Sequence, residues 1–262
     1  MTTSTKKSKT SAADNDRFNE IDALITTPAN KERLVAAKSA DELRTIAEEL
    51  GVDTGRDSSD MGKFIHKLKV IGVDFVTMAK ADAAERRADL ADKAEAMAER
   101  ADDLPFVRLW SGAVENDEDA SGAYGIVDAD GTAIWYGSFS TRFEKIRKAG
   151  DLISAEQSAA DKAVYAASKA REAAGLEEIS LWLTTTCPEL DEAALKTSGA
   201  RLGVAVDITV DDEDESAVRM AEAPGYRSLK NVTTEELTAL VETESEDEDD
   251  PAEDMEGREG NE

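Results

Sequence analysis

The chain has 262 residues and a formal net charge of −27, from 58 acidic and 31 basic residues. Its length suits two domains of the usual ~100–150 residues. One cysteine, Cys187, excludes an internal disulfide, and one histidine, His66, excludes a metal site with two histidine ligands. No apolar run approaches the ~20 residues that span a bilayer. We therefore expect a cytoplasmic protein without a membrane partner.

Both ends of the chain are expected to be disordered. Residues 1–16 are polar, and residues 241–262 contain twelve acidic residues against one basic residue, Arg258. Segments with so little apolar surface cannot offset the entropy lost on folding. An acidic tail repels nucleic acid and can occupy a basic patch on a partner protein. Adaptation to high salt would produce a similar acidic excess, and composition does not separate these explanations.

Residues 17–73 are predicted to form a helical module. Ser39 and Glu42 have the spacing of a capping box, and the helix that follows is expected to end at Gly51. A second helix with one apolar face is expected to end at Gly72. Two short helices joined by a loop can bind nucleic acid, although such a pair more often serves as a packing or interaction unit.

Residues 74–104 are predicted to form one long connector helix. The stretch is rich in Ala, Glu, Asp, Arg and Lys and contains no Gly or Pro. Apolar side chains recur every seven residues, but the second stripe of a coiled coil is incomplete. We therefore favour a single amphipathic helix and keep self-association through residues 75–104 as an alternative.

From residue 105 to residue 240 the pattern changes to alternating strands and helices. Asp128–Gly131 is expected to be a hairpin turn, since the later ligands of a calcium loop are missing. Ser154 and Gln157 are expected to form a capping box that opens an alanine-rich helix. The expected strands are 106–110, 123–127, 132–139, 179–183 and 204–210, and the expected helices are 154–174, 188–195, 215–222 and 233–241.

The order of these elements resembles the ribonuclease H-like fold over residues 106–229. Three local patterns support the resemblance: the glycine-containing strand 121–127, the helix opening at Ser154–Glu156, and the run 215–221 in the last helix. The predicted fold is therefore an N-terminal helical region and a long helix, followed by a mixed sheet with helices and an acidic tail.

The resemblance implies hydrolysis of a phosphodiester by two Mg²⁺ ions that several carboxylates hold together. Glu156 matches the glutamate of the family's helix. Ser111, the run 184–186 and Val218 stand where the other three carboxylates would lie. One carboxylate cannot assemble a two-metal site, so we expect a catalytically degenerate domain that holds no metal and no cofactor, with Mg²⁺ needed only if activity survives.

A basic cluster could still contact nucleic acid. Arg142, Lys145, Arg147 and Lys148 lie between the third predicted strand and the alanine-rich helix, close to where the family's substrate approaches. A charged loop that balances nearby acid is the alternative. Cys187 has no base near it in the sequence, so we expect it to be structural.

The sequence favours a non-catalytic binding or assembly module, associated with nucleic acid and of a phage or mobile-element type. Two alternatives stay open. One is an acidic mimic of nucleic acid, or a binder of basic protein partners. The other is a divalent-metal nuclease whose acidic site has been rearranged.

Overall fold

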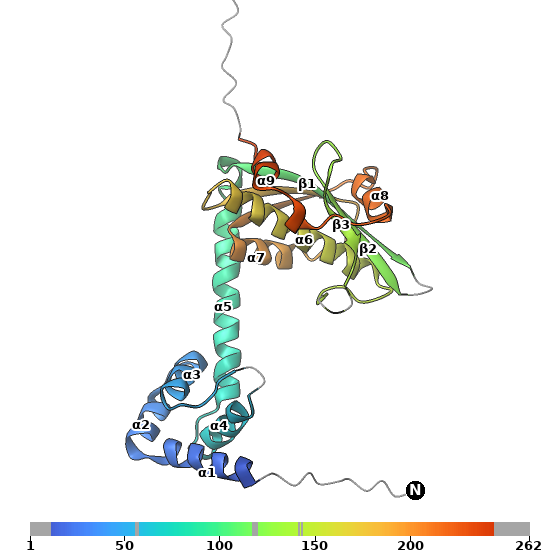
Figure 1. The fold of residues 1–262 in the computed structure, drawn as a ribbon. Coiled ribbons are helices and arrows are strands. Elements are labelled where there is room, and N and C mark those ends of the chain that lie inside the picture. Colours follow the sequence, from blue (N-terminus) through green and yellow to red (C-terminus); the bar gives the residue numbers. More distant parts are fainter. Residues whose placement is uncertain (1–11, 56–57, 117–119, 141, 143, 244–262) are drawn as a thin grey trace, which may run out of the picture. The chain divides into compact units, whose positions relative to one another are not determined.

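The computed structural model describes most of the chain as two compact units, divided between Asp89 and Leu90 (Figure 1). The described residues are 12–55, 58–116, 120–140, 142 and 144–243.

The first unit is helical, as the sequence predicts. Ser39 precedes the third helix, and its side-chain oxygen accepts a hydrogen bond from the backbone N–H of Glu42 at 3.0 Å. The Glu42 carboxylate accepts from the N–H of Lys38 at 2.8 Å, one residue before the position that a capping box requires. The helices are α1 (Ala12–Thr26), α2 (Pro28–Ala36), α3 (Ala40–Glu49), α4 (Ser59–Val70) and the first part of α5 (Phe75–Ala98).

The second unit contains the predicted mixed sheet. Its strand order is β3-β2-β1-β4-β5. The first three strands in the chain pair antiparallel, β1 with β2 and β2 with β3. The other two pairs, β1 with β4 and β4 with β5, are parallel. The strands are β1 (Phe106–Asn116), β2 (Ser121–Val127), β3 (Ala133–Ser138), β4 (Ile179–Thr185) and β5 (Val204–Val210). The later helices are α6 (Leu152–Ala173), α7 (Glu192–Leu202), α8 (Ser216–Glu222) and α9 (Thr234–Ala239), with short 3₁₀ turns η1 (Ala101–Asp103) and η2 (Leu229–Asn231).

The hairpin turn between β2 and β3 is confirmed. The Asp128 carboxylate accepts hydrogen bonds from the backbone N–H groups of Asp130 and Thr132, at 3.0 and 2.8 Å. Gly131 has a φ of +76°, a backbone conformation that favours glycine. The Asp128 carboxylate therefore closes the turn by binding backbone N–H groups of the turn itself.

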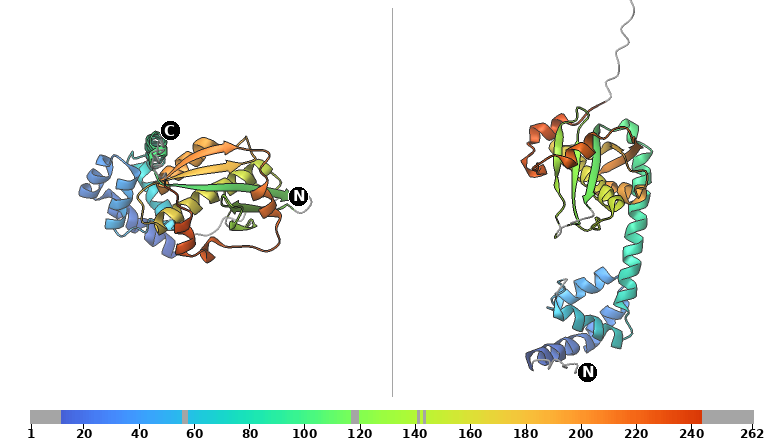
Figure 2. Two further views of the ribbon diagram at one scale, coloured as in Figure 1. Left: turned by 90° about the horizontal axis from the view of Figure 1, so that it is seen from above. Right: turned by 90° about the vertical axis from the view of Figure 1, so that its right-hand side faces the viewer.

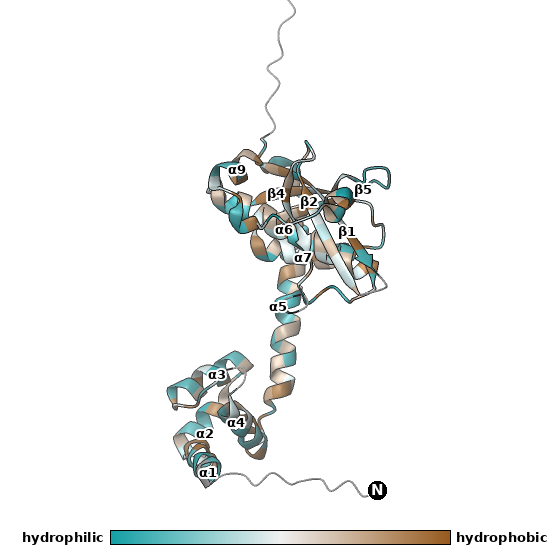
Figure 3. Cartoon of the chain, turned by 45° about the vertical axis from the view of Figure 1, so that its right-hand side comes forward, coloured by the Kyte–Doolittle hydropathy of each residue, from teal (hydrophilic) through white to brown (hydrophobic). Residues whose placement is uncertain are grey.

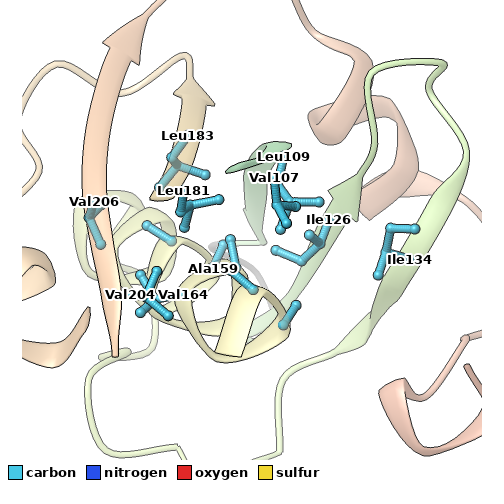
Figure 4. Close-up of a cluster of buried hydrophobic side chains, with 14 of the residues drawn as sticks. Val107, Leu109, Ile126, Ile134, Ala159, Val164, Leu181, Leu183, Val204 and Val206 are labelled. Carbon is cyan, nitrogen blue, oxygen red and sulfur yellow. The ribbon is translucent and has the colours of Figure 1, made fainter. Parts of the chain in front are cut away.

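Helices cover both faces of the sheet (Figure 2). On one face, which we call the inner face, the alanine side of α6 packs on the apolar side chains of the central strands, as Figure 4 shows. On the opposite, outer face, α8 lies against Gly112 of β1 and Gly125 of β2. A Cβ atom at Gly125 would come within 2.3 Å of the backbone oxygen of Ala217. The two glycines therefore permit the close approach of α8.

The expected capping box at Ser154 and Gln157 is wrong. Helix α6 begins earlier, with Asp151 as the N-cap, whose side chain accepts from the N–H of Ser154 at 3.3 Å. The Gln157 side chain accepts a hydrogen bond from the N–H of Asp191 at 2.7 Å. The Ser154 hydroxyl accepts a hydrogen bond from the N–H of Lys148 at 2.7 Å, so both side chains bind backbone outside α6, which local spacing does not reveal.

Structure begins before residue 17 and continues past residue 241. Helix α1 starts at Ala12, and Glu242 pairs with Phe106 through two backbone hydrogen bonds of 2.9 and 2.8 Å. The rest of the segments expected to be disordered, 1–11 and 244–262, lies outside the described residues.

Helix α5 alternates hydrophilic and hydrophobic residues along its length (Figure 3). In the described ranges, no helix combines the length and the apolar character that crossing a membrane requires.

Candidate functional site

The candidate site lies on the inner face, at the point where the pairing of β1 with β4 ends. The two strands pair from Phe106 and Ser180 as far as Ser111 and Thr185. Strand β4 then ends, while β1 continues to Asn116 alongside β2 only. The backbone of β1 beyond Ser111 therefore has no strand beside it on the β4 side.

Glu156 of α6 fills this gap. Its side chain is buried, with 4% of the residue exposed. The Oε1 atom accepts a hydrogen bond from the backbone N–H of Ala113 at 3.0 Å. The Oε2 atom is also buried and has no hydrogen-bond partner among the described residues. The carboxyl group thus accepts a β1 hydrogen bond that a neighbouring strand would otherwise accept. Only one of its two oxygens has a partner among the described residues.

Burial changes the acidity of Glu156. Removal from water disfavours the charged form and raises the pKa of the carboxyl group to about 7, although the hydrogen bond from Ala113 pulls in the opposite direction. Glu156 therefore exchanges its proton near neutral pH, unlike an exposed glutamate, whose pKa is ~4.3.

Two buried polar side chains near Glu156, from β1 and β4, carry hydroxyl groups. Ser111, two residues before Ala113 on the same face of β1, is 1% exposed, and its hydroxyl has no partner in the described part of the chain. Thr185 is 2% exposed and accepts a hydrogen bond from the N–H of Cys187 at 3.2 Å. The site therefore offers hydroxyl groups where a metal centre would need carboxylates.

Cys187 is held in its neutral form. Burial raises the pKa of its thiol, and the negative charges of Glu156 and Glu189 raise it further. A thiolate is the reactive form of cysteine, so the thiol is a poor nucleophile here. This environment agrees with the structural role expected from the sequence.

The geometry offers no ready ligand set for a metal ion. Within the described ranges, no three His, Cys, Asp or Glu side chains converge as they would around a cation. Val218 of α8 lies on the outer face, against Gly112. Glu156 is therefore the one carboxylate at the four implied positions, and carboxylates are the protein ligands that Mg²⁺ chiefly uses.

Arg147 belongs to a buried ion pair. Its guanidinium donates hydrogen bonds to both carboxylate oxygens of Glu115, and each side chain is only 4% exposed. It also donates to the backbone oxygen of Ala120 at 2.8 Å, and Glu115 accepts from the N–H of Gly150 at 3.0 Å. Arg147 therefore ties the segment before α6 to the end of β1.

The other residues of the predicted basic cluster lie at the surface. Arg142, Lys145 and Lys148 are all exposed. Their contact with nucleic acid stays a prediction, and these three residues, unlike Arg147, present their side chains to solvent.

Sequence reasoning missed a cluster around Lys162. Its ammonium lies 5.0 to 5.6 Å from the ring centres of Tyr124, Trp135 and Phe139 and binds the Glu144 carboxylate at 2.6 Å. These residues come from two strands, a loop and a helix, so no local pattern links them. In the sequence, this cluster was indicated only by three aromatic residues that lie within a short stretch of the chain. The cluster fixes the segment after β3 against α6.

Comparison of the chain with models of protein families, with curated proteins and with solved structures gives no match.

Proposed function

We propose that residues 106–229 form a ribonuclease H-like domain that lacks a working metal site and serves as a binding or assembly module. The order of the five strands supports this proposal. In that family, three antiparallel strands are followed by parallel ones with the first strand central, and this sheet has the same arrangement.

The environment of Glu156 carries the non-catalytic part of the proposal. A two-metal hydrolase gathers several carboxylates so that two cations can stabilise the attacking and leaving oxygens. Here Glu156 is buried beside Ser111 and Thr185, and one of its oxygens is bound to the backbone of Ala113. A single carboxyl group whose pKa is raised to about 7 is a weak site for one cation and does not hold two.

Cleavage and metal binding test the proposal together. The full chain is titrated with Mg²⁺ in a calorimeter and incubated with an RNA–DNA hybrid at millimolar Mg²⁺. We expect no two-site binding isotherm and no cleavage, and the same result for Glu156→Gln. Two bound ions together with cleavage that Glu156→Gln abolishes would favour the rearranged nuclease instead.

Binding without cleavage is the positive outcome of this proposal. If Lys145 and Lys148 contact phosphates, their double replacement by alanine lowers the slope of log affinity against log salt by about 2 for a duplex ligand. The matched control is the double alanine variant of Lys196 and Lys230, which removes the same charge elsewhere. Equal effects of the two variants would show that the basic cluster has no specific role.

A further inference from the structure

The outer face of the sheet holds a groove that the proposed function does not use. It measures about 430 Å³ and lies over β1, β4 and β5. Side chains that face outward alternate along each strand with the buried residues of the inner face. The groove is lined by Asp102, Arg108, Trp110, Trp182, Thr184, Asp207 and Thr209.

Trp182 supplies an aromatic surface in this groove. One face of its ring stacks on Phe106, with ring centres 4.1 Å apart and planes 9° apart. Phe106 belongs to β1, whereas Asp207 belongs to β5 on the other side and is the register partner of Trp182. The ring face turned towards β5 therefore lies beside a carboxylate.

The positively charged residue of the groove, Arg108, already has partners within the chain. The Arg108 guanidinium lies 5.0 Å from the ring centres of both Phe106 and Trp182, and 3.7 Å from the Glu242 carboxylate. Asp102 and Asp207 are exposed, and neither forms an ion pair with any residue that the structure describes. The charge left available in the groove is therefore negative.

We propose that this groove binds an arginine side chain of a partner protein. The planar guanidinium stacks on the open face of Trp182 and forms an ion pair with Asp207, with Asp102 as a second acceptor at the rim. A guanidinium combines stacking with paired N–H donors, which an ammonium does not, so arginine is favoured over lysine. The net charge of −27 attracts a basic partner over long range.

A single-stranded nucleic acid is the other ligand that stacks on tryptophan. Its phosphates would approach Asp102 and Asp207, and Arg108, the one cation among the described residues that line the groove, is already paired with Glu242. The same charges that favour arginine therefore oppose a polyanion. Because the groove lies on the face opposite Glu156, the inference does not depend on the proposed ribonuclease H-like ancestry.

An arginine peptide tests this inference on the full chain. Binding of a fluorescent octa-arginine peptide is measured by anisotropy at physiological salt, with octalysine and oligothymidylate as comparison ligands. We expect Asp207→Asn to weaken octa-arginine binding about tenfold and Asp102→Asn by a smaller factor. Trp182→Phe, which retains a ring against Phe106, should reduce the preference for octa-arginine over octalysine.

The matched control is Asp212→Asn, which removes the same charge from an exposed residue outside the groove. Melting temperatures of all variants establish that they are folded. Equal weakening by Asp212→Asn and Asp207→Asn would show that octa-arginine binds only through the overall negative charge of the chain, and would overturn the inference. So would loss of binding on deletion of residues 244–262 with no effect of the groove variants, or stronger binding of oligothymidylate than of octa-arginine.

Discussion

The Oε1 atom of Glu156 lies 3.0 Å from the backbone nitrogen of Ala113, and this hydrogen bond joins α6 to β1 where β1 has lost its parallel neighbour. The contact gives Glu156 a structural task that does not need a metal ion. It also leaves a titratable group in the core, because the second carboxyl oxygen has no partner among the described residues.

Replacement of Glu156 by glutamine should change how stability depends on pH. The pKa of the carboxyl group rises from 4.5 to about 7 on folding, so the folded state binds the proton more tightly than the unfolded state. The wild type is therefore stabilised at low pH and loses about 3 kcal/mol of unfolding free energy as the pH rises from about 4.5 to about 7.

Glu156→Gln should remove this part of the pH dependence, because an amide does not titrate. Urea unfolding of both proteins between pH 4.5 and pH 8 measures the difference, and subtraction cancels the other titrating groups. Parallel curves for the two proteins would contradict the raised pKa.

Ser111→Ala should leave stability unchanged or raise it by about 1 kcal/mol, because the buried Ser111 hydroxyl has no partner in the described structure. Ser158→Ala is the matched control. Its hydroxyl donates to the Glu144 carboxylate at 2.6 Å, so its loss should cost about 1–3 kcal/mol. Denaturant unfolding of the two variants gives the comparison, and an equal loss in both would mean that Ser111 has a partner in solution.

Gly125→Ala should destabilise the second unit by about 3 kcal/mol, because the new Cβ would collide with the backbone of α8. The control is Gly131→Ala in the hairpin turn, where φ is +76° and no atom lies within 4 Å of the new carbon. Only the backbone conformation is disfavoured there, at a cost of about 1–2 kcal/mol. Thermal unfolding measures both, and a larger effect at Gly131 would contradict the close approach of α8.

Arg147→Ala should cost about 3–5 kcal/mol, because it leaves the Glu115 carboxylate buried without its counter-ion. Lys145→Ala, two residues away at the surface, should change stability by less than about 0.5 kcal/mol. Chemical denaturation at neutral pH checks both values. If the two variants behaved alike, the Arg147–Glu115 pair would be exposed in solution.

Much of the second unit was predictable because its elements carry local signals. Alternating residues indicated the strands, alanine at helical spacing indicated α6, and Asp128 to Gly131 indicated a tight turn. The start of α6 was less predictable. Asp151 and Ser154 are both good capping residues, and the choice between them depends on the path of the preceding loop, where Ser154 binds the backbone of Lys148.

The candidate site was predictable only in part. Glu156 and Ser111 followed from the resemblance, whereas the bond to Ala113 and the proximity of Cys187 did not. The ion pair of Arg147 with Glu115 and the groove beside Trp182 and Asp207 were also missed. Each depends on which strands become neighbours and where one of them ends.

The amino-acid sequence by itself determined the acidic balance, the succession of strands and helices, and the presence of a lone glutamate where the resemblance implies four carboxylates. The first two properties follow from composition and from patterns over a few residues, whereas the third rests on the resemblance. Tertiary structure alone decided that Glu156 is buried, that Arg147 is paired, and that two aspartates line one groove with a tryptophan on the outer face. Burial and charge pairing arise between segments far apart in the chain, so they exist only once the sheet has formed.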